Sequence, residues 1–143
     1  MNNWFECKVS YDKLRENGTQ KKVTESYLVD ALSFTEAEAR TIEEMRPYLS
    51  GGFSVAVVRR ARISEIFLNP DGDRYYRFKI VFVTLDEKSG AEKRTACVVI
   101  AQACTLKEAI DVLEEAMKGT LADYEIVSVT ETAIMDVFYA EGK

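Results

Sequence analysis

The feature that most constrains this chain is an internal repeat spanning nearly all of its 143 residues. Laid beside itself without gaps, the chain matches at a shift of 72 positions, which pairs Trp4 with Tyr76, Gly18 with Gly90, Ala31 with Ala103, Ser33 with Thr105 and Met45 with Met117. After one deletion the shift becomes 71 and the matches resume, ending with Phe67 on Phe138. Chance similarity of two segments is the alternative, but turn, cap and strand positions all coincide. We therefore interpret the chain as two copies of one unit, at about residues 3–68 and 75–140.

Each copy opens with a pattern typical of a β-hairpin. Residues 5–11 alternate apolar and polar side chains, as a half-buried strand does, and residues 76–83 alternate before turning wholly apolar. A turn follows at Asn17-Gly18 in the first copy and at Ser89-Gly90 in the second. We expect the second strands at residues 23–29 and 95–101.

A helix is predicted after each hairpin. Ser33 with Glu36, and Thr105 with Glu108, have the spacing of a capping box, in which the hydroxyl accepts a backbone N–H and the Glu reaches back to the N–H of the cap. The helices should therefore begin at Phe34 and Leu106. Each carries one apolar stripe at helical spacing, which predicts that each helix covers a sheet.

A long third strand closes each copy. Residues 53–68 exceed the usual strand length, so we expect a bulge or bend near Arg59-Arg60, and residues 124–138 form the matching strand. The join at residues 69–73 has the Pro, Asp and Gly of a turn. These elements predict an α+β fold: a tandem duplication of a ββαβ unit with a mixed, mainly antiparallel sheet, two helices packed on sheet, and a pseudo-two-fold axis. We expect residues 1–143 to be a single compact domain. Whether the strands form one sheet or two half-sheets stays open.

Composition excludes several kinds of chemistry. The chain has no histidine, so Ser-His-Asp and Cys-His nucleophile activation and His-containing metal sites are excluded. Cys7, Cys97 and Cys104 form no C-x-x-C pair, and we expect small buried residues in a reducing compartment; Cys104, beside a helix start, is the candidate for a catalytic thiolate. No cofactor or metal is expected. No signal-peptide pattern or long apolar run is present, which predicts a soluble, cytoplasmic protein.

The candidate binding residues are a cluster of arginines and tyrosines around the join between the copies: Arg59, Arg60, Arg62, Arg74, Tyr75, Tyr76 and Arg77. If the third strand pairs with the first strand of the next copy, these side chains come together and could hold phosphate, carboxylate or single-stranded nucleic acid. At a shift of 71, Arg59, Arg60 and Arg62 match Thr130, Glu131 and Ala133, so the fold does not require the arginines. The alternative is simple cross-strand pairing of the arginines with Glu65, Asp71 or Asp73.

Several segments resemble a bacterial family catalogued as a domain of unknown function, the DUF4494 type, also met in phage-associated genes. The resemblance lies in residues 4–8, 21–25, 27–31, 33–39, 86–95 and 129–138, whose sequences are Trp-Phe-Glu-Cys-Lys, Lys-Lys-Val-Thr-Glu, Tyr-Leu-Val-Asp-Ala, Ser-Phe-Thr-Glu-Ala-Glu-Ala, Asp-Glu-Lys-Ser-Gly-Ala-Glu-Lys-Arg-Thr and Val-Thr-Glu-Thr-Ala-Ile-Met-Asp-Val-Phe. It covers nearly the whole chain and implies no activity, cofactor or catalytic residue.

The functional expectation is a non-enzymatic protein-interaction or adaptor module that contacts another protein or a second copy of itself through a sheet surface or strand edge. The motivation is a duplicated scaffold without a convergent catalytic set. The alternative is anion or single-stranded nucleic-acid binding through the arginine cluster. A net charge of −5 requires any such site to be local, because non-specific nucleic-acid binders are normally basic. An enzyme using Cys104 or paired carboxylates is the third hypothesis, and no membrane partner is expected.

Overall fold

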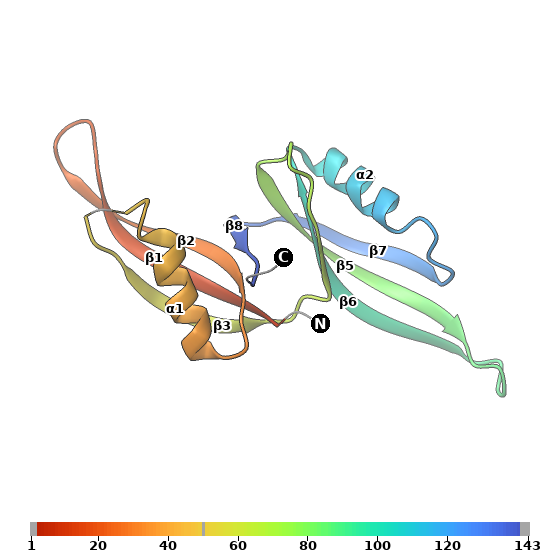
Figure 1. Ribbon diagram of the computed structural model, residues 1–143. Coiled ribbons are helices and arrows are strands. Elements are labelled where there is room, and N and C mark those ends of the chain that lie inside the picture. The colour runs from red at the N-terminus through yellow and green to blue at the C-terminus, as the bar shows by residue number, and fades with distance from the viewer. Residues whose placement is uncertain (1–2, 50, 141–143) are drawn as a thin grey trace. The chain divides into compact units, whose positions relative to one another are not determined.

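The structure is a computed structural model that describes residues 3–49 and 51–140. Its elements follow the same order twice (Figure 1). The first copy contains β1 (Trp4–Leu14), β2 (Gln20–Asp30), α1 (Phe34–Met45), β3 (Ser54–Ala61) and β4 (Glu65–Phe67). The second copy contains β5 (Arg74–Leu85), β6 (Glu92–Ala103), α2 (Leu106–Ala116), β7 (Asp123–Glu131) and β8 (Ile134–Phe138).

The strands form two four-stranded mixed sheets, which answers the question that the sequence left open. One sheet has the order β3-β1-β2-β8 and the other the order β4-β6-β5-β7. Neighbouring strands are antiparallel except at one edge of each sheet, where β8 runs parallel to β2 and β4 parallel to β6. Helix α1 packs on the first sheet and α2 on the second. The α+β fold with a helix on each sheet is therefore confirmed.

The expected single long third strand is wrong, because the chain changes sheets within it. The chain divides into two compact units, and the boundaries fall after Arg62 and after Thr132. Strand β3 remains in the sheet of its own copy, while β4 joins the sheet of the other copy. Strand β8 of the second copy returns in the same way to pair with β2. Each unit therefore contains one strand of the other copy, and the prediction of a single compact domain stays a prediction.

Each unit has its own hydrophobic core between sheet and helix. In the first unit, Phe5, Cys7 and Val9 on β1 are fully buried. In the second, Tyr76, Phe78 and Ile80 on β5 take the same role, and Leu113 of α2 packs into that core. Burial also raises the pKa of the Cys7 thiol, which agrees with the expectation that this cysteine is a structural residue.

The strand register corrects the alignment of the two first strands. Phe5 pairs with Val29 in the first sheet, and Tyr76 pairs with Ala101, the counterpart of Val29, in the second. Phe5 therefore corresponds to Tyr76, whereas the ungapped sequence comparison placed Trp4 there. The cause lies in the turns, since Leu14 pairs with Gln20 but the hairpin of the second copy closes between Leu85 and Glu92, with one more residue in its loop. The shift is thus 71 in the first strands and 72 after the turn.

The capping boxes start both helices where the sequence predicts. The Ser33 hydroxyl accepts a hydrogen bond from the Glu36 backbone N–H at 3.1 Å, and Thr105 accepts one from Glu108 at the same distance. In the second box, the Glu108 carboxylate reaches one residue beyond the cap and accepts from the Cys104 N–H at 3.1 Å. Because these donors have no partner within the helix, the side chains fix where each helix begins. Within the described residues, neither helix is long and apolar enough to cross a membrane.

Gly72 offers a test of how tightly the join between the copies packs. A Cβ atom at this position would lie 2.5 Å from the Cα of Ala103, which is backbone and cannot move aside easily. We expect Gly72→Ala to lower the free energy of unfolding by about 1–3 kcal/mol, as overpacking does. Gly51→Ala is the control, because nothing lies within 4 Å of its added Cβ, and it should change stability by less than about 0.5 kcal/mol. Denaturant unfolding measures both; equal stabilities would contradict the close approach.

Candidate functional site

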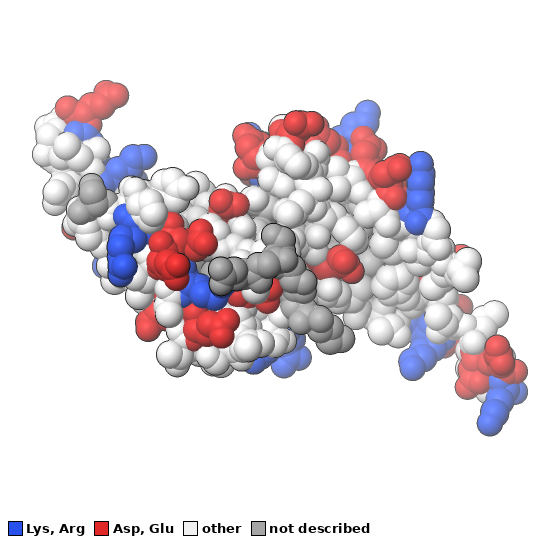
Figure 2. All heavy atoms as spheres, in the orientation of Figure 1, with Lys and Arg blue, Asp and Glu red and all other residues white. Residues whose placement is uncertain are grey.

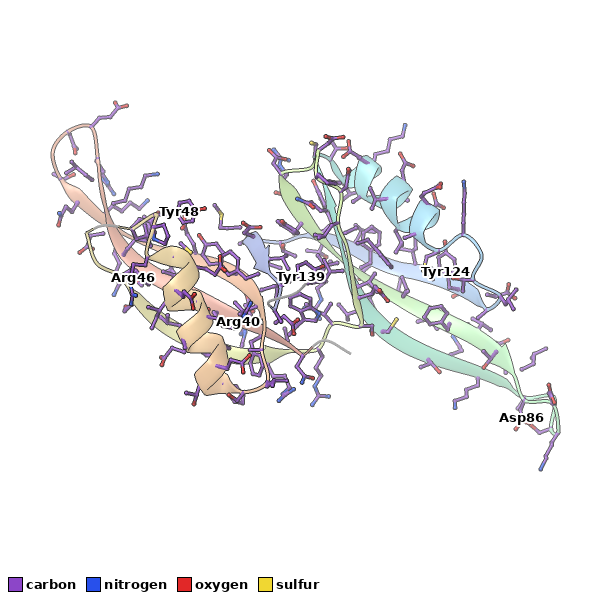
Figure 3. All side chains as sticks on the ribbon, in the orientation of Figure 1. Arg40, Arg46, Tyr48, Asp86, Tyr124 and Tyr139 are labelled. Carbon is purple, nitrogen blue, oxygen red and sulfur yellow. The ribbon has the colours of Figure 1, made fainter. Side chains whose placement is uncertain are left out.

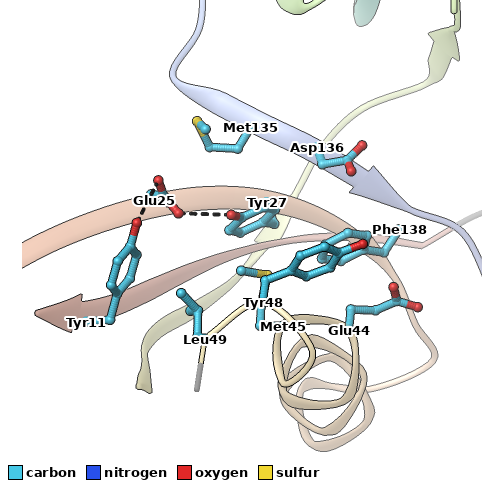
Figure 4. Close-up of a pocket in the computed structure, with 10 residues that line it drawn as sticks. All are labelled: Tyr11, Glu25, Tyr27, Glu44, Met45, Tyr48, Leu49, Met135, Asp136 and Phe138. Atoms are coloured by element: carbon cyan, nitrogen blue, oxygen red, sulfur yellow. Dashed lines mark hydrogen bonds between the residues drawn. The ribbon is translucent and has the colours of Figure 1, made fainter. Parts of the chain in front are cut away.

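The strongest candidate site is a pocket of about 540 Å³ in the first unit, between the C-terminal end of α1 and strands β1, β2 and β8 (Figure 4). Four aromatic rings line it: Tyr11, Tyr27, Tyr48 and Phe138. Three carboxylates complete its polar lining: Glu25, Glu44 and Asp136. We call this site the aromatic pocket. Since β8 belongs to the second copy, the pocket depends on the strand that this copy supplies to the first unit.

Glu25 is the polar centre of the aromatic pocket. The Tyr11 hydroxyl donates a hydrogen bond to one carboxylate oxygen at 3.2 Å, and the Tyr27 hydroxyl donates to the other at 3.0 Å (Figure 4). Burial raises the pKa of Tyr27, and the hydrogen bond to Glu25 and its charge raise it further. The pKa of Tyr11 is raised by burial and by the same carboxylate. Both phenols therefore keep their protons and act as donors.

The aromatic pocket has a packed floor and an open rim. The Tyr27 ring stacks on the Phe138 ring, with 5.2 Å between the ring centroids and 13° between the ring planes. Met45, which also lines the pocket, is buried. Tyr48, which follows α1, is 78% exposed and stands at the rim. Arg40 of α1 donates a hydrogen bond to the Tyr139 carbonyl, which ties the helix to the segment after β8 (Figure 3). These contacts hold the rings of the floor in place before anything binds.

The second copy shows that the fold does not need this polar cluster. By the observed register, Phe82, Cys97 and Val99 take the places of Tyr11, Glu25 and Tyr27. Val99 belongs to the core of the second unit, and Phe82 and Cys97 pack against that core. The same backbone framework is therefore stable with an apolar set. The hydroxyls and the carboxylate are particular to the first copy.

Sequence reasoning missed the aromatic pocket, although a signal was present. The ungapped repeat alignment already sets Glu25 and Tyr27 opposite Cys97 and Val99, but it sets Tyr11 opposite Val83, which lies on the other face of its strand. With the shift corrected to 71 in the first strand, all three differences fall on one face of the sheet. The contribution of Asp136 and Phe138 could not be predicted, because the pattern of β8 does not say which sheet it joins.

The predicted arginine cluster is divided between the two units. Strand β3 pairs with β1, and β5 pairs with β6 and β7, so the proposed hairpin between the third strand and the next first strand does not form. Arg59, Arg60 and Arg62 lie in the first unit, whereas Arg74 and Arg77 lie in the second. Tyr76 is 1% exposed in the core and cannot stack on a base. Tyr75 points to the opposite face of β5, as alternation along a strand requires.

Most of these arginines interact with neighbours inside their own unit. Arg59 Nε donates to Glu6 at 2.8 Å, and Arg60 lies over the Phe5 ring at 5.1 Å. Arg74 pairs with Glu131 at 3.8 Å, and a side-chain hydrogen bond with Tyr76 raises its pKa, as does Glu131. Cross-strand pairing of the arginines, the alternative, is thus present: Glu6 and Glu131 are the ion-pair partners, and the charge of Asp73 also raises the pKa of Arg74. Arg62 and Arg77 are exposed and form no ion pair with a described residue.

The surface charge does not gather into a basic patch on the face drawn in Figure 2, where Lys and Arg lie among Asp and Glu. Metal-ligating residues do not converge either: in the part of the chain that the structure describes, no group of three or more Cys, Asp or Glu side chains could hold a metal ion. The Cys104 thiol is half-buried and contacts the Asp71 carbonyl at 3.1 Å.

The two long edge strands are the other candidate contact surfaces. Strands β3 and β7 are each hydrogen-bonded on one side in their sheets. Each carries a bulge at the same place, because the register skips Ala56 in β3 and the matching Val127 in β7. Bulges at edges distort the row of free backbone groups and oppose pairing with another chain. The aromatic pocket is therefore the better candidate for recognition.

Comparison with known proteins gives a family and no activity. A family model described as Domain of unknown function (DUF4494) matches residues 3–140. None of the curated proteins compared with the sequence matches it.

The raised pKa of Tyr27 predicts a pH effect on stability. The pKa of Tyr27 is higher in the native state than in the unfolded state, where it has the usual value of about 10. The unfolded state therefore loses the phenol proton first, and the free energy of unfolding falls as the pH rises above about 10. Tyr27→Phe should cost about 1–3 kcal/mol at neutral pH through the lost hydrogen bond to Glu25. The difference in the free energy of unfolding between the wild type and Tyr27→Phe should be constant below about pH 9 and shrink above about pH 10. Denaturant unfolding across this range measures it, and an unchanged difference at high pH would contradict the assignment.

The placement of the arginines predicts that the protein binds single-stranded oligonucleotide weakly and that the affinity depends little on salt. Within the arginine cluster, Arg62 and Arg77 are the two that form neither an ion pair nor a ring contact with a described residue. The cluster should therefore neutralise at most about two phosphates, and log K against log salt should fall with a slope no steeper than about −1.4. Fluorescence anisotropy of a labelled oligonucleotide measures the slope. A much steeper slope that disappears in the double variant Arg62→Glu, Arg77→Glu would restore the arginine cluster as a nucleic-acid site.

Proposed function

The chain belongs to the DUF4494 family, and we propose that it is a non-enzymatic protein-interaction module whose contact site is the aromatic pocket of the first unit. The observation that carries this proposal is the replacement of an apolar core set in the second copy by two hydroxyls and a carboxylate in the first. A polar group retained where the same fold is stable without it points to binding rather than to stability.

The form of the aromatic pocket suits a side chain presented by another protein. Its volume lies within the range of about 300–1,000 Å³ typical of ligand sites. Tyr48 is largely exposed at the rim, and tyrosine is among the residues that contribute most to binding at protein interfaces. An inserted side chain would cover Tyr48 and contact the stacked rings of Tyr27 and Phe138.

The chemistry of the lining favours binding over catalysis. The ten lining residues include no Ser, Thr, Cys or Lys that could act as a nucleophile. A tyrosine that acts as a base needs a lowered pKa, whereas those of Tyr11 and Tyr27 are raised. Both hydroxyls also donate to Glu25 and are therefore already occupied. Self-association is one form of this proposal, in which a second copy supplies the inserted side chain.

Selection from a random peptide library displayed on phage tests the proposal. Peptides selected on the wild-type protein should bind Tyr48→Ala at least about tenfold more weakly, because the rim ring is lost. Leu121→Ala is the matched control, since Leu121 is a fully exposed large side chain in the other unit, and it should leave affinity unchanged. Both positions are exposed, so neither variant should disturb folding.

Two results would count against this function. One is a failure to select any peptide that binds in a saturable manner. The other is a set of peptides that bind Tyr48→Ala as tightly as wild type. Light scattering on the same three proteins tests the self-associating form, which predicts a wild-type dimer that Tyr48→Ala weakens and Leu121→Ala does not.

A further inference from the structure

We infer that the group received by the aromatic pocket is an alkylammonium cation, as at the end of a lysine side chain. This inference rests on the same site as the proposed function and adds the chemical class of its ligand. It is argued from charge, from the arrangement of the rings and from the comparison of the two copies.

The negative charge of the residues that line the aromatic pocket favours a cationic ligand. Glu25, Glu44 and Asp136 are the ionisable carboxyl groups of the aromatic pocket, and no Lys or Arg lines it. Glu25 is half-buried and forms no ion pair with a described Lys or Arg. Its two tyrosine donors use about half of the roughly four lone-pair positions of a carboxylate, which leaves room for an ammonium N–H. A partly buried carboxylate without a cation is costly, and a bound ammonium would offset that cost.

The rings supply the second part of the recognition. Aromatic faces attract an ammonium group within about 6 Å of their centres, more strongly where water is excluded. Tyr27 and Phe138 are stacked, and Tyr11 lies on the other side of the Glu25 carboxylate from Tyr27 (Figure 4). Met45 and Leu49 give an apolar wall along which the carbon chain of an alkylammonium can lie. A neutral ligand would gain the apolar contacts but leave Glu25 without a counter-charge.

The two copies separate this role from a structural one. In the second unit the place of Glu25 is taken by Cys97, and Phe82 and Val99 stand where the two tyrosines are. Ring or apolar surface is therefore kept at these positions, and what the first copy adds is a negative charge held by two donors. An ammonium ligand uses that addition, whereas an anion would be repelled by it.

Titration with n-butylammonium, and with 1-pentanol as the neutral probe of similar size, tests the inference by NMR chemical shifts. We expect n-butylammonium to shift the Tyr27 and Phe138 signals in a saturable manner, with a Kd of about 1 mM. 1-Pentanol should bind at least about tenfold more weakly. Glu25→Gln should weaken n-butylammonium binding by about tenfold or more. The substitution removes the negative charge, while the amide oxygen of the glutamine can still accept a hydrogen bond from one tyrosine hydroxyl.

Two further variants keep the test independent of folding. Glu44 and Glu43 are neighbouring exposed residues of α1, and Glu44 lines the aromatic pocket while Glu43 does not. Glu44→Gln should weaken n-butylammonium binding by about twofold to fivefold, and Glu43→Gln should leave it unchanged. Equal binding of the alcohol and the ammonium, no saturable binding up to about 10 mM, or full binding by Glu25→Gln with native unfolding behaviour would overturn the inference.

The source of the cation is distinguished with a blocked Gly-Gly-Lys-Gly-Gly peptide. Tighter binding of the peptide than of n-butylammonium identifies a protein-borne lysine, and tighter binding of n-butylammonium identifies a free amine. Peptides selected on phage that lack lysine would overturn this inference and leave the proposed function standing. Saturable n-butylammonium binding without any selectable peptide would support this inference and count against the proposed function.

Discussion

The parallel pairing of one short strand at the edge of each sheet is the contact on which the rest of the structure depends. Strand β8 completes the first sheet beside β2, and β4 completes the second beside β6, so neither copy supplies all four strands of its own sheet. A chain cut between the copies would leave β2 and β6 with unpaired edges, which invite aggregation. Each sheet is therefore complete only with an edge strand from the other copy. The pairing of β8 with β2 also brings Asp136 and Phe138 of the second copy to the aromatic pocket of the first.

Local chemistry made much of this fold predictable. Alternation gave the strands, the Ser33 and Thr105 caps set the helix starts, and the repeat doubled the weight of each observation. The sequence pattern of a strand does not predict which strand it pairs with, because an alternating segment such as β4 or β8 fits the edge of either sheet. The break at residues 62–64 was therefore invisible, and with it the reason why Arg62 and Arg74 belong to different units.

The difference between the copies carries more functional information than either copy alone. A duplicated fold contains its own comparison, since residues required by the architecture should recur and residues required by binding need not. The core positions Val9 and Ile80 recur as apolar residues. The Glu25 position does not recur, and its counterpart Cys97 packs against the core of the second unit. The replacement of Glu25 by Cys97 is present at the shift of 72, and the hairpin register adds Tyr11, whose place is taken by Phe82 at a shift of 71.

The energetics of Glu25 explain why its retention is informative. Two hydroxyl donors recover part of the hydration that a half-buried carboxylate loses, but they bring no positive charge. An apolar set at the same place would avoid that cost, as the second copy demonstrates. Natural proteins keep such locally unfavourable groups mainly where binding or catalysis uses them. Because the hydroxyls orient the carboxylate and their raised pKa keeps them as donors, the charge is already positioned before a cation arrives, and little ordering remains to oppose its binding.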